Sequence, residues 1–187
     1  MIYDLRYTVK SYLEGNRNFP IRQCNPGEGN VETCCKVCCA DCFSGDINAW
    51  DVTGVRDMHG LFQGSQMWTT GGTVYFNDDI DGWDVSGVTN MDGMFGNNAA
   101  FDKPLSSWDV SGVTSMRAMF TWTETFNQDI NAWDVSNVQI MQQMFDAARK
   151  FNQPLVGWDT DSVSNMLYMF DGAWEQNPRP SWWSNTG

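Results

Sequence analysis

Long hydrophobic runs are missing from this sequence. Its longest apolar stretches are only a few residues, too short for a membrane-spanning helix. Residues 1–20 also lack the apolar core of about 7–15 residues that marks a secretory signal peptide. We therefore expect one of three things: a chain that is not secreted, one that begins after processing, or a piece of a longer chain.

Basic residues are scarce. The 187 residues include 23 acidic and 11 basic side chains, which gives a formal net charge of −12. A surface this acidic repels phosphate backbones and so disfavours nucleic acid as a partner. Aromatic residues, in contrast, are abundant at 14%, with ten Trp and eleven Phe, a composition that disordered chains do not have.

Recognisable catalytic motifs are also missing. The sequence has a single histidine, His59, and contains no GxSxG, HExxH, P-loop or GxGxxG pattern. We expect His59 to be an ordinary surface residue, because it falls at a position that varies between the repeats described below. The expectation is a protein that is not an enzyme and carries no cofactor.

Cysteine is confined to one short segment. The six residues are Cys24, Cys34, Cys35, Cys38, Cys39 and Cys42. An even number packed into one segment favours disulfides, and disulfides favour an extracellular or cell-surface location. A metal site and free thiols are the alternatives, although two abutting CxxC units suit one tetrahedral zinc site poorly. The sequence does not choose among the disulfide pairings.

A 25-residue period dominates what is present. Trp-Asp pairs recur with gaps of 33, 25, 25 and 25 residues, and the longer first gap indicates an insertion near 65–74. Phe and Met keep the same step. The tryptophans form a predicted core ladder of Trp50, Trp83, Trp108, Trp133 and Trp158.

One repeat, residues 126–150, shows what each unit is expected to form. Residues 126–130 suit a short extended segment, and apolar spacings of three, three and one from Val138 to Phe145 predict a short helix. Asp134 or Ser136 would cap that helix. Roughly eight buried side chains at about 1.5–3 kcal/mol each do not offset the ordering of one repeat alone, so the repeats must stack.

The sequence therefore predicts an α/β solenoid. We expect a right-handed, leucine-rich-repeat-like stack of about five coils, each a short strand plus a short helix, behind an N-terminal capping helix. The predicted parts are a capping helix and linker at 1–23, a cysteine-rich disulfide segment at 24–42, the repeats at 43–170 and a degenerate C-terminal coil or cap at 171–187.

Stacking would place polar residues in columns as well. Asn77, Asn127 and Asn152, with Asn177 as a further candidate, predict an asparagine ladder that is interrupted by Asp102. An aspartate column is expected to accept N–H bonds from the turn after each Asp, with calcium along the column as the functional alternative. The column consists of Asp51, Asp84, Asp109, Asp134 and Asp159.

The signature FNQDIxxWDVSxVxxMxxMFxxA, which recurs in register over roughly residues 43–170, resembles the BspA-like leucine-rich repeat family, formerly a mycoplasma-named family of unknown function. The opening segment YDLRYTVKSYL also resembles the family's usual N-terminal entry, whereas the cysteine-rich insertion departs from the family pattern. The resemblance implies a secreted or surface protein with a role in adhesion or protein interaction.

Two functions remain open at this stage. In the first, the variable positions Arg117, Ala118, Gln142, Gln143, Leu167 and Tyr168 recognise proteins or cell-surface glycans. In the second, the chain is a structural subunit of an extracellular filament, sheath or coat, joined to copies of itself or to other subunits. The C-terminal tryptophans are the candidate contacts for such an assembly. They are Trp174, Trp182 and Trp183, of which Trp183 continues the 25-residue step from Trp158.

Overall fold

The structure is a computed structural model that describes residue 9 and residues 46–64, 75–173 and 180–183. The predicted capping helix, the six cysteines, the insertion near 65–74, Trp174 and Asn177 lie outside the described residues, apart from Val9 of the expected helix. Val9 is buried and belongs to the same hydrophobic cluster as the repeats.

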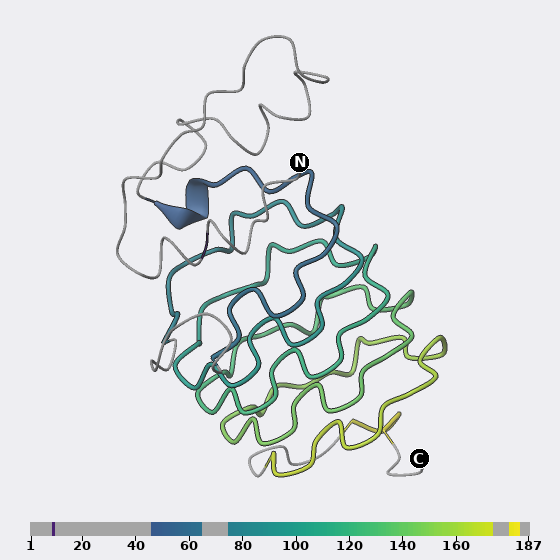
Figure 1. Ribbon diagram of the computed structural model, residues 1–187. Helices are drawn as coiled ribbons and strands as arrows, with labels where there is room; N and C mark the ends of the chain where they lie inside the picture. The colour runs from purple at the N-terminus through teal and green to yellow at the C-terminus, as the bar shows by residue number, and fades with distance from the viewer. Residues whose placement is uncertain (1–8, 10–45, 65–74, 174–179, 184–187) are drawn as a thin grey trace.

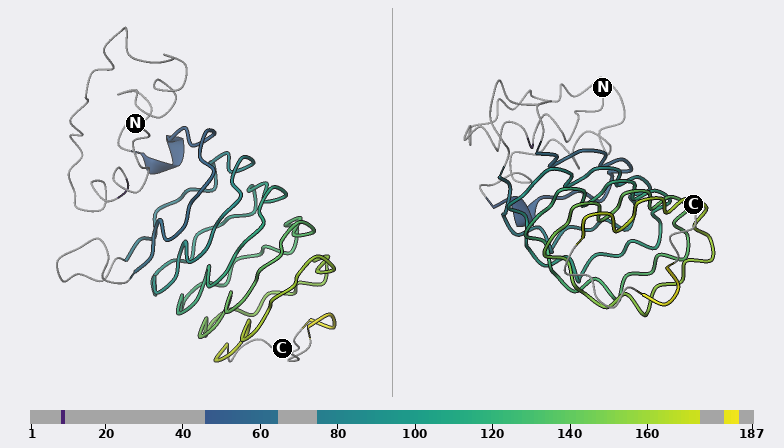
Figure 2. Two further views of the ribbon diagram at one scale, coloured as in Figure 1. Left: turned by 45° about the vertical axis from the view of Figure 1, so that its right-hand side comes forward. Right: turned by 90° about the horizontal axis from the view of Figure 1, so that it is seen from below.

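Successive repeats lie side by side as coils of chain, stacked from the N-terminal to the C-terminal end of the described region (Figures 1 and 2). One 3-10 helix, η1 at Ile47–Ala49, lies at the start of this region, and Asp46 caps it by accepting from the N–H of Asn48. Parallel bridges, each an isolated pair, link neighbouring coils. The pairs are Asp57 with Asn90, Asn90 with Ser115, Ser115 with Ile140, and Ile140 with Asn165.

The predicted α/β solenoid with a strand and a helix in every coil is wrong. In the part of the chain that the structure describes, η1 is the only element with a helix or strand label, and the coils themselves consist of turns and isolated bridges. The spacing of three, three and one comes from tight turns instead. The N–H of Met144 bonds to the carbonyl of Met141, three residues back, and the N–H of Ala148 bonds to Phe145.

Left-handed residues explain why these turns do not continue into a helix. Each turn needs a positive φ at its third residue, and Gln143 and Ala147 supply it with φ of 57° and 54°. The N–H groups of Met141, Gln143, Phe145 and Ala147 then donate to carbonyls of the next coil. Every second N–H group therefore donates to the neighbouring coil. An α-helix would need each of these groups to donate to a carbonyl four residues back in its own coil.

Two phenylalanine columns form the centre of the stack. Phe62, Phe95 and Phe120 lie ring over ring, with centroids 5.6 and 5.5 Å apart. The second column interleaves with the first, since Phe126 lies 4.1 Å from Phe120. These rings and the neighbouring methionines are almost fully buried, so each coil covers the apolar face of the next.

The Trp-Asp tryptophans line a second wall of the core. All five are buried. The ring of Trp50 stacks on that of Trp83, and the ring of Trp108 on that of Trp133, with ring centroids 6.4 Å apart in both pairs. The column continues to Trp182, which stacks on Trp158 at 6.2 Å. Trp183, the residue that the 25-residue step selects, instead packs edge-on against Phe170. The last coil is therefore one residue shorter than the repeat period predicts.

The asparagine ladder runs on without interruption through Asp102. The N–H of Asp102 donates to Asn77 Oδ1 at 2.9 Å, and Asp102 Oδ1 accepts from the N–H of Asn127 at 3.0 Å. Asn127 Oδ1 accepts in turn from the N–H of Asn152. The predicted interruption is wrong because the ladder uses only the Oδ1 acceptor, which aspartate and asparagine share.

Candidate recognition face

One run of each coil carries the bridging residue, then a methionine that is buried in all coils but the last, then an outward side chain. In the third full repeat these are Ile140, Met141 and Gln142. We call the outward residues and their C-terminal neighbours the recognition face. Its first column is His59, Asp92, Arg117, Gln142 and Leu167, and its second column is Gly60, Gly93, Ala118, Gln143 and Tyr168.

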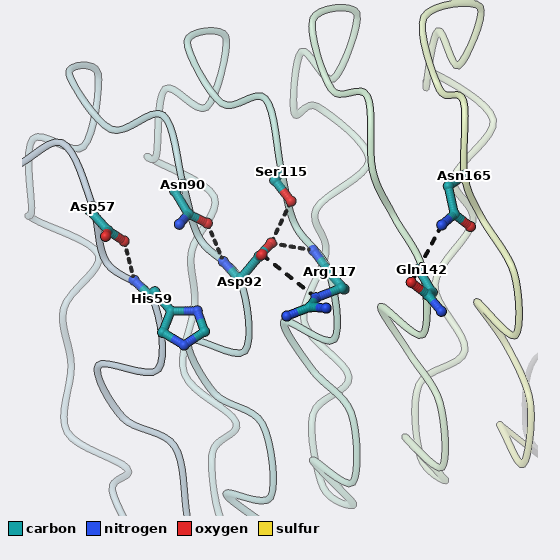
Figure 3. Close-up of polar contacts among 8 residues, drawn as sticks. All are labelled: Asp57, His59, Asn90, Asp92, Ser115, Arg117, Gln142 and Asn165. Atoms are coloured by element: carbon teal, nitrogen blue, oxygen red, sulfur yellow. Dashed lines mark hydrogen bonds and ion pairs between the residues drawn. The ribbon is translucent and has the colours of Figure 1, made fainter.

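The first column is oriented from the bridging position. Asp57 Oδ1 accepts from the N–H of His59 at 2.8 Å (Figure 3). Likewise, Asn165 Oδ1 accepts from the N–H of Leu167 at 3.1 Å. Asn90 does the same for Asp92. These short-range bonds hold the backbone of the outward residue and do not depend on which side chain it carries.

Asp92 joins two coils on this face. It accepts from the hydroxyl of Ser115 and from the N–H of Arg117, the latter at 2.9 Å. Its other oxygen lies 3.7 Å from Nε of Arg117, whose side chain is 53% exposed (Figure 3). An exposed pair of this kind adds only about 0–1 kcal/mol, so it orients Arg117 more than it stabilises the fold.

The second column occupies the left-handed position of the first turn. Gly60 and Gly93 adopt it at no steric cost, whereas Ala118, Gln143 and Tyr168 have φ of 53°, 57° and 58°. Tyr168 is 56% exposed. The side chain of Gln143 donates to Asp146 Oδ2 at 3.3 Å. Burial of the carboxyl raises the pKa of Asp146, an effect that the Gln143 bond opposes and that the nearby Asp171 charge reinforces.

The aspartate column lies elsewhere on the coils and is occupied by local hydrogen bonds. Asp134 Oδ1 accepts from both the N–H and the hydroxyl of Ser136, at 3.1 and 2.6 Å. Asp84 does the same with Ser86, and these bonds, the hydroxyl bond first, lower the pKa of both carboxyls. Among the described residues, no group of three or more His, Cys, Asp or Glu side chains is arranged to hold a metal ion.

The structure describes two of the three tryptophans that are candidate contacts at the C-terminal end. Trp182 and Trp183 are half-buried against the last coils, and Nε1 of Trp182 donates to the carbonyl of Leu155 at 2.8 Å. Trp174 lies outside the described residues. No helix in the described part of the chain is long and apolar enough to cross a membrane.

Sequence reasoning missed Trp122, which is 48% exposed and has φ of 55°. It follows the recognition face by four residues in its coil, at the left-handed position of the second turn. Its equivalents in the neighbouring coils are Asn97 and Ala147. A tryptophan in register with an asparagine and an alanine was the signal available in the sequence.

Among the comparisons with known proteins, only the one with protein families finds a match. No curated protein and no solved structure matches the chain. A family described as "Mycoplasma protein of unknown function, DUF285" matches residues 30–72 and 65–183, which together span most of the chain. The chain therefore belongs to the DUF285 family of Mycoplasma-named proteins of unknown function.

Proposed function

We propose that this protein is a non-enzymatic extracellular or cell-surface protein that serves adhesion or protein interaction through its recognition face. The observation that carries the proposal is a contrast along the coils. The methionine of the bridging run recurs in every coil, buried at Met58, Met91, Met116 and Met141 and partly buried at Met166, while the outward residue after it changes from His59 to Asp92 to Arg117. The fold therefore needs the methionine and leaves the outward position open for recognition.

The resemblance of the repeat signature to BspA-like surface proteins supports the same proposal. So does the cluster of six cysteines, because disulfides persist in oxidising compartments outside the cytosol. Antibodies against residues 75–173 test the location. We expect them to label intact, unpermeabilised producing cells or to detect the protein in the medium. Antigen found only after permeabilisation would contradict a surface role.

A bead assay tests the recognition face. Beads coated with the full chain should adhere to producing cells, and the triple variant His59→Ser, Arg117→Ser, Gln142→Ser should reduce adhesion several-fold. The matched control changes three exposed residues outside the face and removes one positive charge as well: Ser106→Ala, Ala132→Ser, Lys150→Ser. Equal adhesion by both triple variants would show that the face does not bind.

A structural subunit is the second candidate. The last full coil exposes Leu167 and Tyr168 by 39% and 56%, and apolar side chains at the end of a stack suit a head-to-tail contact. Electron microscopy separates the candidates. Fibres that form from purified protein favour assembly, and monomers that retain adhesion favour recognition.

A further inference from the structure

Trp122 is a bulky side chain in a backbone conformation that disfavours it. Its φ of 55° lies in the left-handed region, which glycine and asparagine tolerate and which strains a bulky residue such as tryptophan. The repeat requires this conformation here, since Asn97 and Ala147 have φ of 59° and 54° at the equivalent positions. The repeat does not require an indole, because an amide and a methyl group serve in the neighbouring coils.

The backbone contact at this position is independent of the side chain. The N–H of Trp122 donates to the carbonyl of Asp146 at 2.7 Å, and the N–H of Asn97 donates to Thr121 at 2.7 Å. The indole is also outside the buried tryptophan column, since nearly half of its surface is exposed. Strain kept at an exposed aromatic residue with no part in the core points to a contact with something outside the chain.

Polar residues lie next to Trp122 along its own coil and across the backbone bonds to the coils on either side. The neighbouring residues Asn97, Thr121 and Asp146 are all half-buried, and Gln143 donates to Asp146. In its own repeat, residues 101–125, Trp122 is the sole exposed large hydrophobic residue, and the others in the described range 75–173 are Tyr75, Val156, Leu167 and Tyr168. A protein interface needs an apolar centre on a patch of about 800 Å² per partner, and one ring among amides, hydroxyls and a carboxylate does not provide it.

A sugar ring matches this chemistry. The C–H face of a pyranose packs on an aromatic ring, and its hydroxyls exchange hydrogen bonds with amides and carboxylates at the rim. The net charge of −12 repels sulfated, phosphorylated and uronic-acid polymers. We infer that Trp122 is a stacking platform for a pyranose ring of an uncharged glycan, with Asn97, Thr121 and Asp146 as its polar rim.

Tyr168 offers a second ring of the same kind. It is 56% exposed and left-handed at φ of 58°, where the equivalent residues Gly93 and Ala118 have small side chains or none. It lies two coils beyond Trp122, or about 10 Å along the stack at the spacing of neighbouring strands. Two separated rings fit an oligosaccharide better than a single sugar. This assignment rests on the proposed recognition role and names its ligand class.

Binding of the full chain to neutral polysaccharides tests the inference. The probes are cellulose, chitin, xylan, mannan and β-1,3-glucan, in pull-down and affinity-gel form, with heparin and alginate as anionic probes. We expect the unaltered chain to bind at least one neutral polymer. Trp122→Gly and Trp122→Asn should weaken that binding about tenfold. Trp122→Phe should retain most of it.

Thermal melting separates a lost contact from a lost fold. Glycine and asparagine both tolerate the left-handed region, so Trp122→Gly and Trp122→Asn should melt at or above the temperature of the unaltered chain. The matched control Ala147→Gly removes a left-handed side chain outside the recognition face without removing an aromatic ring, and it should leave binding unchanged.

Several results would overturn the assignment. They are binding by the unaltered chain to none of the neutral polymers, binding to the anionic polymers alone, or full binding by both Trp122→Gly and Trp122→Asn. If protein-coated beads adhere to cells, and adhesion resists periodate treatment of those cells but is lost after protease treatment, the ligand is a protein. The recognition role then stands and the glycan assignment fails, whereas beads that do not adhere at all contradict the recognition role itself.

Discussion

The indole Nε1 of Trp133 donates a hydrogen bond to the backbone carbonyl of Leu105 in the preceding coil, at 3.0 Å. Trp108 and Trp158 make the same bond to Ile80 and Ile130. Each tryptophan thus fills the wall of one coil and satisfies a buried carbonyl of the coil before it. Such a bond ties the coils together where the bridging run does not reach.

This bond predicts that Trp133→Phe destabilises the protein more than a change in ring size alone would. The carbonyl of Leu105 would lose this bond and keep only the longer one from the N–H of Trp108, at 3.3 Å, which costs about 0.5–1.5 kcal/mol. Trp133→Ala should cost about 3–5 kcal/mol, because a cavity opens as well. Urea unfolding followed by circular dichroism measures both. The exposed Trp122→Phe is the control, and a Trp133→Phe variant as stable as this control would contradict the role of the bond.

The asparagine ladder predicts a difference between two changes at Asp102. Asp102→Asn keeps the Oδ1 acceptor for the N–H of Asn127 and should leave stability nearly unchanged. Asp102→Ala removes that acceptor, which also receives Nε2 of Gln128 at 2.8 Å, and should cost about 0.5–1.5 kcal/mol, since water replaces only part of these bonds at this half-buried position. Thermal unfolding of the two variants at one ionic strength compares them. Equal melting temperatures would mean that the ladder does not hold the coils.

The serine bonds to the aspartate column predict a dependence of stability on pH. Bonds from Ser86 and Ser136 lower the pKa of Asp84 and Asp134 in the folded chain. A carboxyl with a lowered folded pKa stabilises the fold above its unfolded pKa of about 4, and this stabilisation is lost as the pH falls through the folded value. Ser86→Ala and Ser136→Ala should therefore destabilise the fold at pH 7 more than at pH 2.

Melting temperatures at the two pH values check this expectation, and carboxyl titration by NMR locates the groups. Ser111→Ala is not a suitable control because Ser111 bonds to Asp109 in the same way. Ser106→Ala is suitable, since Ser106 is exposed and precedes the tryptophan instead of following it. Equal losses at pH 7 and pH 2 for the Ser86 and Ser136 variants would contradict the linkage.

The repeat period made the buried columns readable in the sequence, because residues 25 apart must meet if coils stack. Trp133 and Phe120 lie where that register places them. The absence of a helix could not be predicted from the spacing of the apolar residues alone. Apolar residues three and four apart arise from a helix or from consecutive tight turns, and what decides here is the left-handed backbone at Gln143 and Ala147. Neither residue is a glycine, and the sign of that conformation was in other copies, where Gly93 and Gly172 stand at the equivalent positions with φ of 59° and 65°.

The recognition face was only partly predictable for the same reason. Variable positions such as Arg117 and Gln142 could be picked out by comparing repeats, and both lie on the face. The role of Asp92 in orienting Arg117 depends on the contact between coils, which the sequence gives only as a register. Trp122 lies two residues beyond the segment equivalent to the predicted helix, and its exposure became visible only in the structure.

The second column of the recognition face predicts opposite effects for two changes at equivalent positions in neighbouring coils. Gly93 has φ of 59°, and a Cβ added there would meet only the side chain of Gln63, 3.9 Å away, so Gly93→Ala tests the backbone alone. The left-handed conformation costs a non-glycine residue about 1–2 kcal/mol in the folded chain. Glycine avoids this strain but loses more backbone entropy on folding, which offsets roughly 0.5–1 kcal/mol of the difference. We expect Gly93→Ala to destabilise the fold by up to about 1 kcal/mol and Ala118→Gly to be neutral or stabilising by a similar amount. Chemical denaturation of both variants at pH 7 measures the pair, and a Gly93→Ala protein more stable than Ala118→Gly would show that these turns do not impose a left-handed residue on every coil.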